Sequence, residues 1–400
     1  MTERAESTLL GKIRQAAADA GLDAVGVTDV APFLAERRAI IERKTAGLHA
    51  GMWFTYGRPE RSTTPASILA GARSIVVCAR VYRPPEEDAP DVSGIRRANS
   101  AAVAAYVATD AYGELRDGLE RISEILRHDG HDAQIVCDDN RLTDRAAAAR
   151  AGLGWLGRNT MLLSRELGSW TVLGSVVTTA GLPVAAEAQP DGCGPCRRCQ
   201  TACPTGALDE AGVLDARRCL AWLVQAPGAF PPEHRDALGH RIYGCDDCQV
   251  VCPYNDPISG LSHDRRTRSQ RQPVQVGAGR DARRGSIDVV ALLGMTDDDL
   301  MGTFGHWYIP RRRPEYLRRN ALIVLGNVGD PTDPDVEEVV REALASPSAV
   351  VASHAVWAAR RLGRDDLVEG AKAVGFLTHD SDGMVAAELA RSTGPRISSG

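Results

Sequence analysis

The segments CGPCRRCQTACP (Cys193–Pro204) and CDDCQVVCP (Cys245–Pro253) decide the fold of this 400-residue chain. The first has the spacing C-x2-C-x2-C-x3-C-P, in which three thiolates bind one 4Fe-4S cluster and the fourth binds a second cluster. The second segment, C-x2-C-x3-C-P, is one ligand short, and Cys219 supplies it. The crossed arrangement therefore predicts two ligand sets, which are Cys193, Cys196, Cys199 and Cys252 for one cluster and Cys203, Cys219, Cys245 and Cys248 for the other.

Disulfides and structural zinc compete with iron–sulfur clusters for these cysteines. Disulfides require an oxidising compartment, and the N-terminus (Met1-Thr2-Glu3-Arg4) lacks the basic and apolar regions of a secretory signal. Structural zinc is the stronger competitor, because C-x2-C pairs also form tetrahedral zinc sites. The three-cysteine ladder before Cys203 and the proline after each C-x3-C favour paired 4Fe-4S clusters. We therefore expect a one-electron relay in a cytoplasmic protein.

The composition is that of a globular protein with room for two or three domains. Hydrophobic residues make up 44% of the chain and the net charge is −5, which argues against a nucleic-acid binder that is basic over its whole surface. No apolar run approaches the roughly 20 residues that span a bilayer, so we expect no membrane insertion. The two remaining cysteines, Cys78 and Cys137, lie in apolar stretches and are predicted to be core thiols.

Helical and strand patterns alternate in the N-terminal part. The predicted elements are a helix over 9–20, a strand over 23–28, a helix over 32–44, a strand over 73–82, a helix over 115–126, a strand over 134–138 and a helix over 142–150. Such interleaving indicates an α/β domain of about 180 residues. The loop over 47–64 carries aromatic residues and Arg58, which can line a pocket, although loop arginines are more often solvated.

Asp138 stands where the strand over 134–138 ends. Binding sites in open α/β sheets gather at the carboxyl ends of strands, so a carboxylate there is a candidate for chemistry. The position alone favours a simpler role at a helix N-terminus, because Asp139 and Asn140 precede the next helix.

A glycine-dense loop and a strand follow this helix. The loop reads AGLGWLGRNT (151–160) and the strand region reads GSWTVLGSVVTT (168–179). Three glycines within six residues predict a backbone that closely approaches another group. The loop is not a nucleotide fingerprint, because it follows a helix instead of opening one after a strand.

Together these stretches resemble the epoxyqueuosine reductase family. The resemblance runs from about residue 8 to about residue 365 and rests on Asp138, Arg145, the two stretches above, DARRCLAW (215–222) and RIYGCDDCQVVCPYN (241–255). It implies reduction of epoxyqueuosine to queuosine at the wobble position (34) of tRNA, by cob(I)alamin fed from two 4Fe-4S clusters. It also implies a cobalamin-binding α/β core similar to that of reductive dehalogenases, an inserted ferredoxin-like module and a C-terminal region of HEAT-like helical repeats.

The resemblance further implies roles for single residues. Asp138 matches the family's aspartate proton donor. The residues expected to contact cobalamin are Arg58, Asp138, Arg158, Asn159, Thr160, Ser169 and Asp246. The sequence departs from the family pattern in its double aspartate, so either Asp138 or Asp139 is the acid, and in Arg158, where relatives usually have lysine.

The C-terminal third combines arginines with helical patterns. The stretch His263–Arg284 is rich in arginine, which is typical of a solvated loop and also suits phosphate contacts. RNALIVLGNVG (319–329) and SHAVWAARRLG (353–363) superpose at a shift of 34 residues, close to the period of α-helical repeats. Five arginines, Arg311, Arg312, Arg313, Arg318 and Arg319, are predicted to form a basic entrance for a large ligand.

We therefore predict three domains, at 1–185, 186–260 and 261–390, in a monomer that takes a tRNA anticodon stem-loop as substrate and a flavodoxin or ferredoxin as electron donor. Two alternatives remain open. One is a cobalamin and iron–sulfur reductase of a small molecule, and the second is an electron-transfer protein without cobalamin. Salt-dependent tRNA binding separates the first alternative from the tRNA enzyme, and the absorption spectrum identifies the second.

Overall fold

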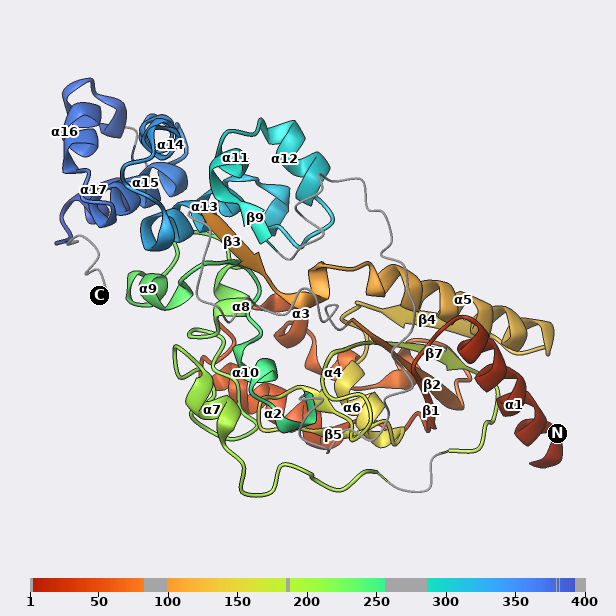
Figure 1. Ribbon diagram of the computed structural model, residues 1–400. Helices are drawn as coiled ribbons and strands as arrows, with labels where there is room; N and C mark the ends of the chain where they lie inside the picture. Colours follow the sequence, from red (N-terminus) through yellow and green to blue (C-terminus); the bar gives the residue numbers. More distant parts are fainter. Residues whose placement is uncertain are drawn as a thin grey trace. The chain divides into compact units, whose positions relative to one another are not determined.

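The computed structural model describes residues 3–82, 99–184, 188–255, 286–378, 380 and 382–392 (Figure 1). The chain divides into two compact units. Unit 1 comprises Met1–Arg83, Thr109–Arg217 and Asp246–Val274, and unit 2 comprises Pro84–Ala108, Arg218–Cys245 and Gln275–Gly400. Each unit is thus assembled from three separate segments, whereas the domains predicted from the sequence are consecutive. The arginine-rich stretch His263–Arg284 lies outside the described residues.

Unit 1 contains a four-stranded sheet with helices on both faces (Figure 1). Its elements are α1 (Glu3–Asp19), β1 (Ala24–Thr28), α2 (Leu34–Thr45), α3 (Trp53–Tyr56), α4 (Pro59–Ser62), β2 (Ser74–Val81), α5 (Ala111–His128), β4 (Ala133–Cys137), α6 (Asp144–Arg150), β5 (Trp155–Leu156), β6 (Leu162–Leu163), β7 (Thr171–Thr178), α7 (Arg198–Ala202) and α10 (Asp247–Val250). Short 3-10 helices lie at Pro65–Ser67 and Pro253–Asn255. The strands and longer helices predicted for this part are confirmed, with boundaries shifted by a few residues.

The sheet has the order β1–β2–β7–β4, and every neighbouring pair is antiparallel. Asp138 directly follows β4, as predicted, but the rule that sites gather at the carboxyl edge of an open sheet does not apply, because it describes parallel strands. Strands β2 and β7 are apolar on both faces, which is typical of parallel sheets. Here both faces are apolar because helices cover both of them.

Alternating residues explain how the two helical layers pack. Helix α5 places Leu115 and Leu119 beside Gly174 of β7, the residue that pairs with Cys78 of β2. On the other face, the alanines of α6 pack with Ile75 and Val77 in one buried cluster. Both cysteines outside the cluster motifs are buried, as predicted, and burial raises the pKa of Cys78 to about 12. Since the core fixes β2, β4 and β7, it also fixes the loops at their ends.

Unit 2 combines a small sheet with a helical array (Figure 1). Its elements are β3 (Ser100–Val103), α8 (Leu220–Leu223), α9 (Arg235–Leu238), β8 (Arg241–Tyr243), β9 (Ser286–Asp288), α11 (Val289–Leu293), α12 (Asp297–Phe304), α13 (Glu315–Val328), α14 (Pro334–Leu344), α15 (Ala349–Arg361), α16 (Asp365–Ala373) and α17 (Met384–Leu389), with 3-10 helices at Ala105–Val107, Pro232–His234, Pro310–Arg312 and Phe376–Thr378. Strand β3 pairs in parallel with β8 and antiparallel with β9. Helices α13 and α15 begin 34 residues apart (Glu315 and Ala349) and pack against each other, so the predicted sequence repeat corresponds to two successive helix pairs.

The predicted basic entrance is only partly exposed. Arg311, Arg312 and Arg313 are exposed, whereas Arg319 is fully buried. The Arg319 guanidinium donates hydrogen bonds to the carbonyl oxygens of Leu223, Val224, Ala226 and Gly228, at and just after the carboxyl end of α8. Its inclusion in an exposed basic surface was therefore wrong, because a cation satisfies the free carbonyls at a helix end.

Among the helices that the structure describes, none combines the length and the apolar character needed to cross a membrane.

Candidate iron–sulfur and active site

The thiols of the first predicted ligand set influence one another's pKa in unit 1, but among the described residues no three cysteine, histidine or acidic side chains are arranged as a closed metal site. Burial raises the pKa of Cys199, and the neighbouring Cys193 and Cys196 raise it further. Burial likewise raises the pKa of Cys252, with added contributions from the other three thiols. Cys252 also packs with Trp155, Leu163 and Tyr254 in an apolar cluster that Cys193 contacts. Mutually close thiols in an apolar wall are the donor set that an iron–sulfur cluster requires.

The prolines of the motif explain why each C-x3-C segment leaves its helix. Helix α7 ends at Ala202, and Cys203 has extended backbone angles (φ −68°, ψ 113°) because the residue before a proline avoids the helical region. The backbone N–H of Ala207 then donates to the Cys203 sulfur at 3.2 Å. Cys199 is thus helical whereas Cys203 is extended. This difference in backbone conformation suits the prediction that the two thiolates bind different clusters.

The second predicted ligand set draws on both units. Cys203 and Cys248 belong to unit 1, whereas Cys219 and Cys245 belong to unit 2. Cys219 is the residue that precedes α8, and its carbonyl oxygen accepts hydrogen bonds from the backbone N–H groups of Trp222 and Leu223. The assignment of this set therefore still rests on the spacing of the motif.

A buried polar network joins the sheet of unit 1 to α10, the helix that carries Cys248. The side-chain oxygen of Gln249 accepts hydrogen bonds from the hydroxyls of Ser169 (3.0 Å) and Tyr82 (3.3 Å). The Asn255 amide donates to the Ser169 hydroxyl and to the Gln249 carbonyl oxygen, both at 2.8 Å. Asp246 accepts from the Gln249 amide at 3.3 Å. We call these five residues the Gln249 network. They connect the end of β2 and the start of β7 to the second cysteine segment, Cys245–Pro253.

Two predicted cobalamin contacts, Ser169 and Asn159, lie inside the protein. Ser169 is fully buried and its hydroxyl is used within the Gln249 network. Asn159 is 4% exposed, and its amide donates to the Cys248 carbonyl oxygen at 3.4 Å. Both side chains therefore hold the cysteine motif in place.

Gly168 is required by the same network. It has a φ of +68°, and a Cβ atom there would lie 2.1 Å from the Asn255 side-chain oxygen. That oxygen accepts the backbone N–H of Ser169 at 2.7 Å. By contrast, a Cβ at Gly154 would meet the Leu163 carbonyl oxygen of the β5–β6 hairpin at 2.0 Å. The group that the predicted glycine loop approaches closely is therefore its own hairpin.

Asp138 lies directly after β4 in an unusual conformation. Its φ is +51°, in the left-handed region that costs a non-glycine residue energy, and its side chain is exposed. The helix that follows begins at Asp144 with Thr143 before it, and no side chain caps it. The N-terminal capping role considered for Asp138 was therefore wrong. Strain of this kind concentrates at functional sites.

Asp139 is held by an arginine. Its carboxylate accepts hydrogen bonds from the Arg141 side chain (2.7 Å) and backbone N–H (2.9 Å). Partial burial acts to raise the pKa of Asp139, but these hydrogen bonds outweigh it and lower the pKa below its usual value. A carboxylate held ionised in this way is a poor proton donor, so the geometry favours Asp138 over Asp139.

Two residues beside Asp138 were not predicted from the sequence. Burial raises the pKa of Asp144 to about 8, with further increases from the charges of Asp138 and Asp139 and an opposing effect of Arg145. Its Oδ1 atom is enclosed and has no hydrogen-bond partner among the described residues. Burial also raises the pKa of Tyr112, to which Asp138 and Asp144 contribute. The Asp144 position was visible beside Arg145, but nothing in the sequence pointed to Tyr112.

The remaining predicted contacts lie on surface loops of unit 1. Arg158 donates a hydrogen bond to the Gly194 carbonyl oxygen at 2.7 Å, which links its loop to the first cysteine segment, Cys193–Pro204. Thr160 has a φ of +65°, and its carbonyl oxygen accepts the Arg145 guanidinium at 2.6 Å. Arg58 is exposed and precedes α4.

Comparisons with known proteins support a two-cluster iron–sulfur protein. Residues 192–255 match the family model of the 4Fe-4S double cluster binding domain. The chain is 31% identical to the epoxyqueuosine reductase of Bacillus anthracis, over 87% of this chain and 88% of that protein. It is also 31% identical to the epoxyqueuosine reductase of Vibrio cholerae, over 88% and 91%.

Two solved structures are similar over almost the whole chain. One is an epoxyqueuosine reductase from Bacillus subtilis with its catalytic aspartate loop swung out of the active site (TM-score 0.81, 28% identity, 96% of this chain and 98% of that chain). The other is an epoxyqueuosine reductase with an epoxyqueuosine-modified tRNA stem loop (TM-score 0.80, 27% identity, 96% and 97%).

Proposed function

The chain belongs to the epoxyqueuosine reductase family, and from this premise we propose that it reduces epoxyqueuosine to queuosine at the wobble position of tRNA. The observation that carries the proposal is the likeness to an enzyme solved with an epoxyqueuosine-modified tRNA stem loop, which extends over 96% of this chain. The reaction takes two electrons and two protons, converts the epoxide to an alkene and releases water. The protein has to supply the electrons singly, the protons and the orientation of the substrate.

The donor sets of the chain suit two 4Fe-4S clusters. For the first set we propose Cys193, Cys196, Cys199 and Cys252, in which the neighbouring thiols help to raise the pKa of Cys199 and Cys252. For the second set we propose Cys203, Cys219, Cys245 and Cys248. Backbone N–H donation to a thiolate, as from Ala207 to Cys203, is a usual way of tuning a cluster's reduction potential.

Cobalamin binding is proposed from the family. Asp138, Thr160 and Arg58 are the accessible members of the predicted contact set, whereas Ser169 and Asn159 would act by positioning the cysteine motif. Their donor and acceptor groups fit a large polar macrocycle that is held by hydrogen bonds. When bound, cobalamin supplies a cobalt centre that accepts electrons one at a time and reduces the carbon–oxygen bond.

The chain's own chemical task is to deliver the proton. The epoxide oxygen leaves as an alkoxide unless an acid within hydrogen-bond reach protonates it. Asp138 is exposed on a strained turn and Asp139 is fixed by Arg141, so we propose Asp138 as the donor. Half-buried Tyr112 and Asp144, whose Oδ1 atom is enclosed, lie beside it, and burial raises the pKa of both side chains.

Turnover of modified tRNA tests the function directly. The chain is reconstituted anaerobically with iron, sulfide and cobalamin, supplied with dithionite and incubated with epoxyqueuosine-containing tRNA. Mass spectrometry of the released nucleoside is expected to show loss of one oxygen. If both cofactors bind and the nucleoside is unchanged, the tRNA function is excluded and a small-molecule substrate takes its place.

The proton donor is tested by Asp138→Asn with Asp139→Asn as its matched control. Turnover should fall by roughly 10²–10⁴-fold in the first variant and stay within about threefold in the second. Iron content and cobalamin absorbance report whether both variants remain loaded. Equal turnover in the loaded Asp138→Asn variant and the parent chain would exclude Asp138 as the acid.

Further proposals concern organisation and surroundings. We propose that the helix pairs from α13 to α16 are HEAT-like repeats and that exposed Arg311, Arg312 and Arg313 contact tRNA phosphates. We also propose a monomeric state, a cytoplasmic location and a division into three domains at 1–185, 186–260 and 261–390. Salt-dependent tRNA binding by an Arg311→Gln variant, with a smaller salt slope than the parent, checks the phosphate contact.

A further inference from the structure

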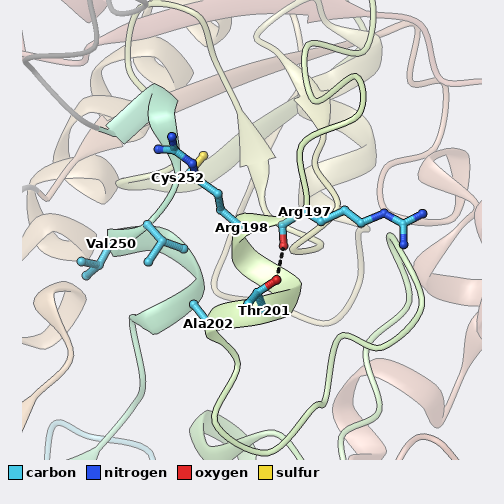
Figure 2. A pocket seen from close by; sticks show the side chains of 7 residues that line it. Arg197, Arg198, Thr201, Ala202, Val250 and Cys252 are labelled. Atoms are coloured by element: carbon cyan, nitrogen blue, oxygen red, sulfur yellow. Dashed lines mark hydrogen bonds between the residues drawn. The ribbon is translucent and has the colours of Figure 1, made fainter.

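A recess of about 610 Å³ opens beside the first cysteine set. It is lined by Arg197, Arg198, Thr201, Ala202, Val250, Val251 and Cys252 (Figure 2). All of these residues belong to unit 1 and come from α7, α10 and the residues that flank them. Helices α7 and α10 pack against each other, so the recess has a fixed floor.

The recess combines an apolar floor with unneutralised positive charge. Val250 is 55% exposed, which is unusual for a side chain of this size. Arg197 and Arg198 are exposed, and no ion pair or hydrogen bond of either side chain is found within the described part of the chain, where Arg197 accepts a hydrogen bond from Thr201 only through its backbone carbonyl. Figure 2 shows the two arginines extending in opposite directions from the start of α7, with Arg198 on the side of Cys252. An apolar centre with charged residues at its rim is typical of a transient protein interface.

The position of Cys252 connects this surface to the proposed first cluster. Cys252 belongs to the first ligand set, and its sulfur lies among the residues that line the recess. The rate of one-electron transfer falls steeply with distance, so a carrier that reduces this cluster has to bind close to it. A protein bound in the recess would be separated from the cluster by little more than the Cys252 side chain.

We propose that the recess is the docking site of an acidic one-electron carrier protein of the flavodoxin or ferredoxin class. The proposal rests on the proposed function, because only a redox enzyme needs such a donor. In each docking event the carrier is oxidised by one electron and the cluster is reduced by one, with no proton or group transferred. Two events, together with two protons, reduce one epoxide to an alkene and water.

Charge distinguishes this occupant from the chain's own arginine-rich stretch. Residues His263–Arg284 are strongly basic in sequence, so Arg197 and Arg198 would repel them. A carrier with acidic residues around its cofactor is attracted to the same arginines, and such steering raises association rates by 10–10³-fold at low salt.

The decisive variant is Arg197→Glu/Arg198→Glu. Its matched control is Arg14→Glu/Arg121→Glu, which makes the same charge change on exposed residues of α1 and α5, on the opposite side of unit 1 from α7 (Figure 1). The probe is an acidic flavodoxin, bound anaerobically to the cluster-loaded chain in low salt and again in about 0.5 M salt, where surface charges are screened. We expect the recess variant to lose at least about tenfold in affinity in low salt, and the control less than about threefold.

Three further readouts make the result interpretable. Stopped-flow reduction of the clusters by flavodoxin should slow in the recess variant, whereas reduction by dithionite should not. Unchanged midpoint potentials of the clusters would show that the substitutions affect docking and not the reduction potential of the cluster near Arg198. If the glutamate variant loses iron, the milder Arg197→Gln/Arg198→Gln variant takes its place. Equal weakening in the control, or unchanged flavodoxin binding in the recess variant, would overturn the proposal. Absence of dithionite-driven tRNA turnover would overturn the proposed function alone, because flavodoxin binding is measured independently.

Discussion

Asp144→Asn provides a pH-dependent test of the environment around Asp138. Burial and two neighbouring carboxylates raise the pKa of Asp144 from 3.8 to about 8. Between about pH 4 and pH 8 the native state therefore holds a proton that the unfolded state has lost. Stability then decreases as pH rises through this window, and the full cost is present above about pH 8.

The magnitude follows from the size of the shift. Each pKa unit corresponds to about 1.4 kcal/mol, so four units set a ceiling of roughly 5 kcal/mol. Water entry and relaxation around the ionised carboxylate reduce this, and we expect roughly 2–3 kcal/mol between pH 6 and pH 9. Asparagine has the same shape and does not titrate, so the variant lacks this pH-dependent cost.

Anaerobic thermal unfolding of the cluster-loaded chain measures the effect. The melting temperature of Asp144→Asn relative to the parent should rise by roughly 5 °C from pH 6 to pH 9. Asp139→Asn is the control, because the pKa of Asp139 is lowered and its contribution is already complete and constant over this range. A melting-temperature difference for Asp144→Asn that stays flat with pH would refute the assignment of a buried neutral carboxyl.

Three other substitutions test the framework around the site. Cys199→Ser should reduce the iron and sulfide content of the reconstituted chain by about half, whereas Cys78→Ser should leave that content unchanged in the same assay, since its thiol lies in the sheet core. Arg319→Met should lower the denaturant-measured free energy of unfolding by roughly 3–5 kcal/mol, because the buried carbonyl oxygens lose their donor. Gly168→Ala should destabilise unit 1 by more than Gly130→Ala, which has a similar positive φ without a close neighbour, and thermal unfolding of both variants measures the difference.

The sequence predicted the elements of unit 1 because hydrophobic periodicity is local. The apolar runs of β2 and β7 and the heptad-like leucines of α5 each occur within one segment. Strand direction depends instead on which segments meet, and a strand that is apolar on both faces, such as β2, does not reveal whether its neighbours run parallel or antiparallel. The two-cluster domain at residues 192–255 was predictable for the same local reason, since Cys193, Cys196 and Cys199 of the motif lie within seven residues of one another.

The site features that could not be predicted from the sequence depend on contacts between distant segments. Tyr112 lies beside Asp138 only because α5 packs against β4, so no spacing between the two residues predicts it. Arg319 was placed at the surface because arginines are usually solvated, but the carbonyls around the end of α8 bury it. Ser169 was expected to contact a cofactor directly, whereas its hydroxyl is used inside the Gln249 network.

Asp138, the proposed proton donor, and residues 246–253 of the second cysteine segment both belong to unit 1. Tyr82 belongs to the Gln249 network and also influences the pKa of Tyr112, which in turn is affected by Asp138. The buried Tyr82 and the half-buried Tyr112 therefore share one electrostatic environment with Asp138. Asp138 itself is exposed on a turn with positive φ, a conformation that the surrounding core does not enclose. On the proposed function, the Gln249 network therefore positions residues 246–253, while exposed Asp138 is accessible to a large substrate.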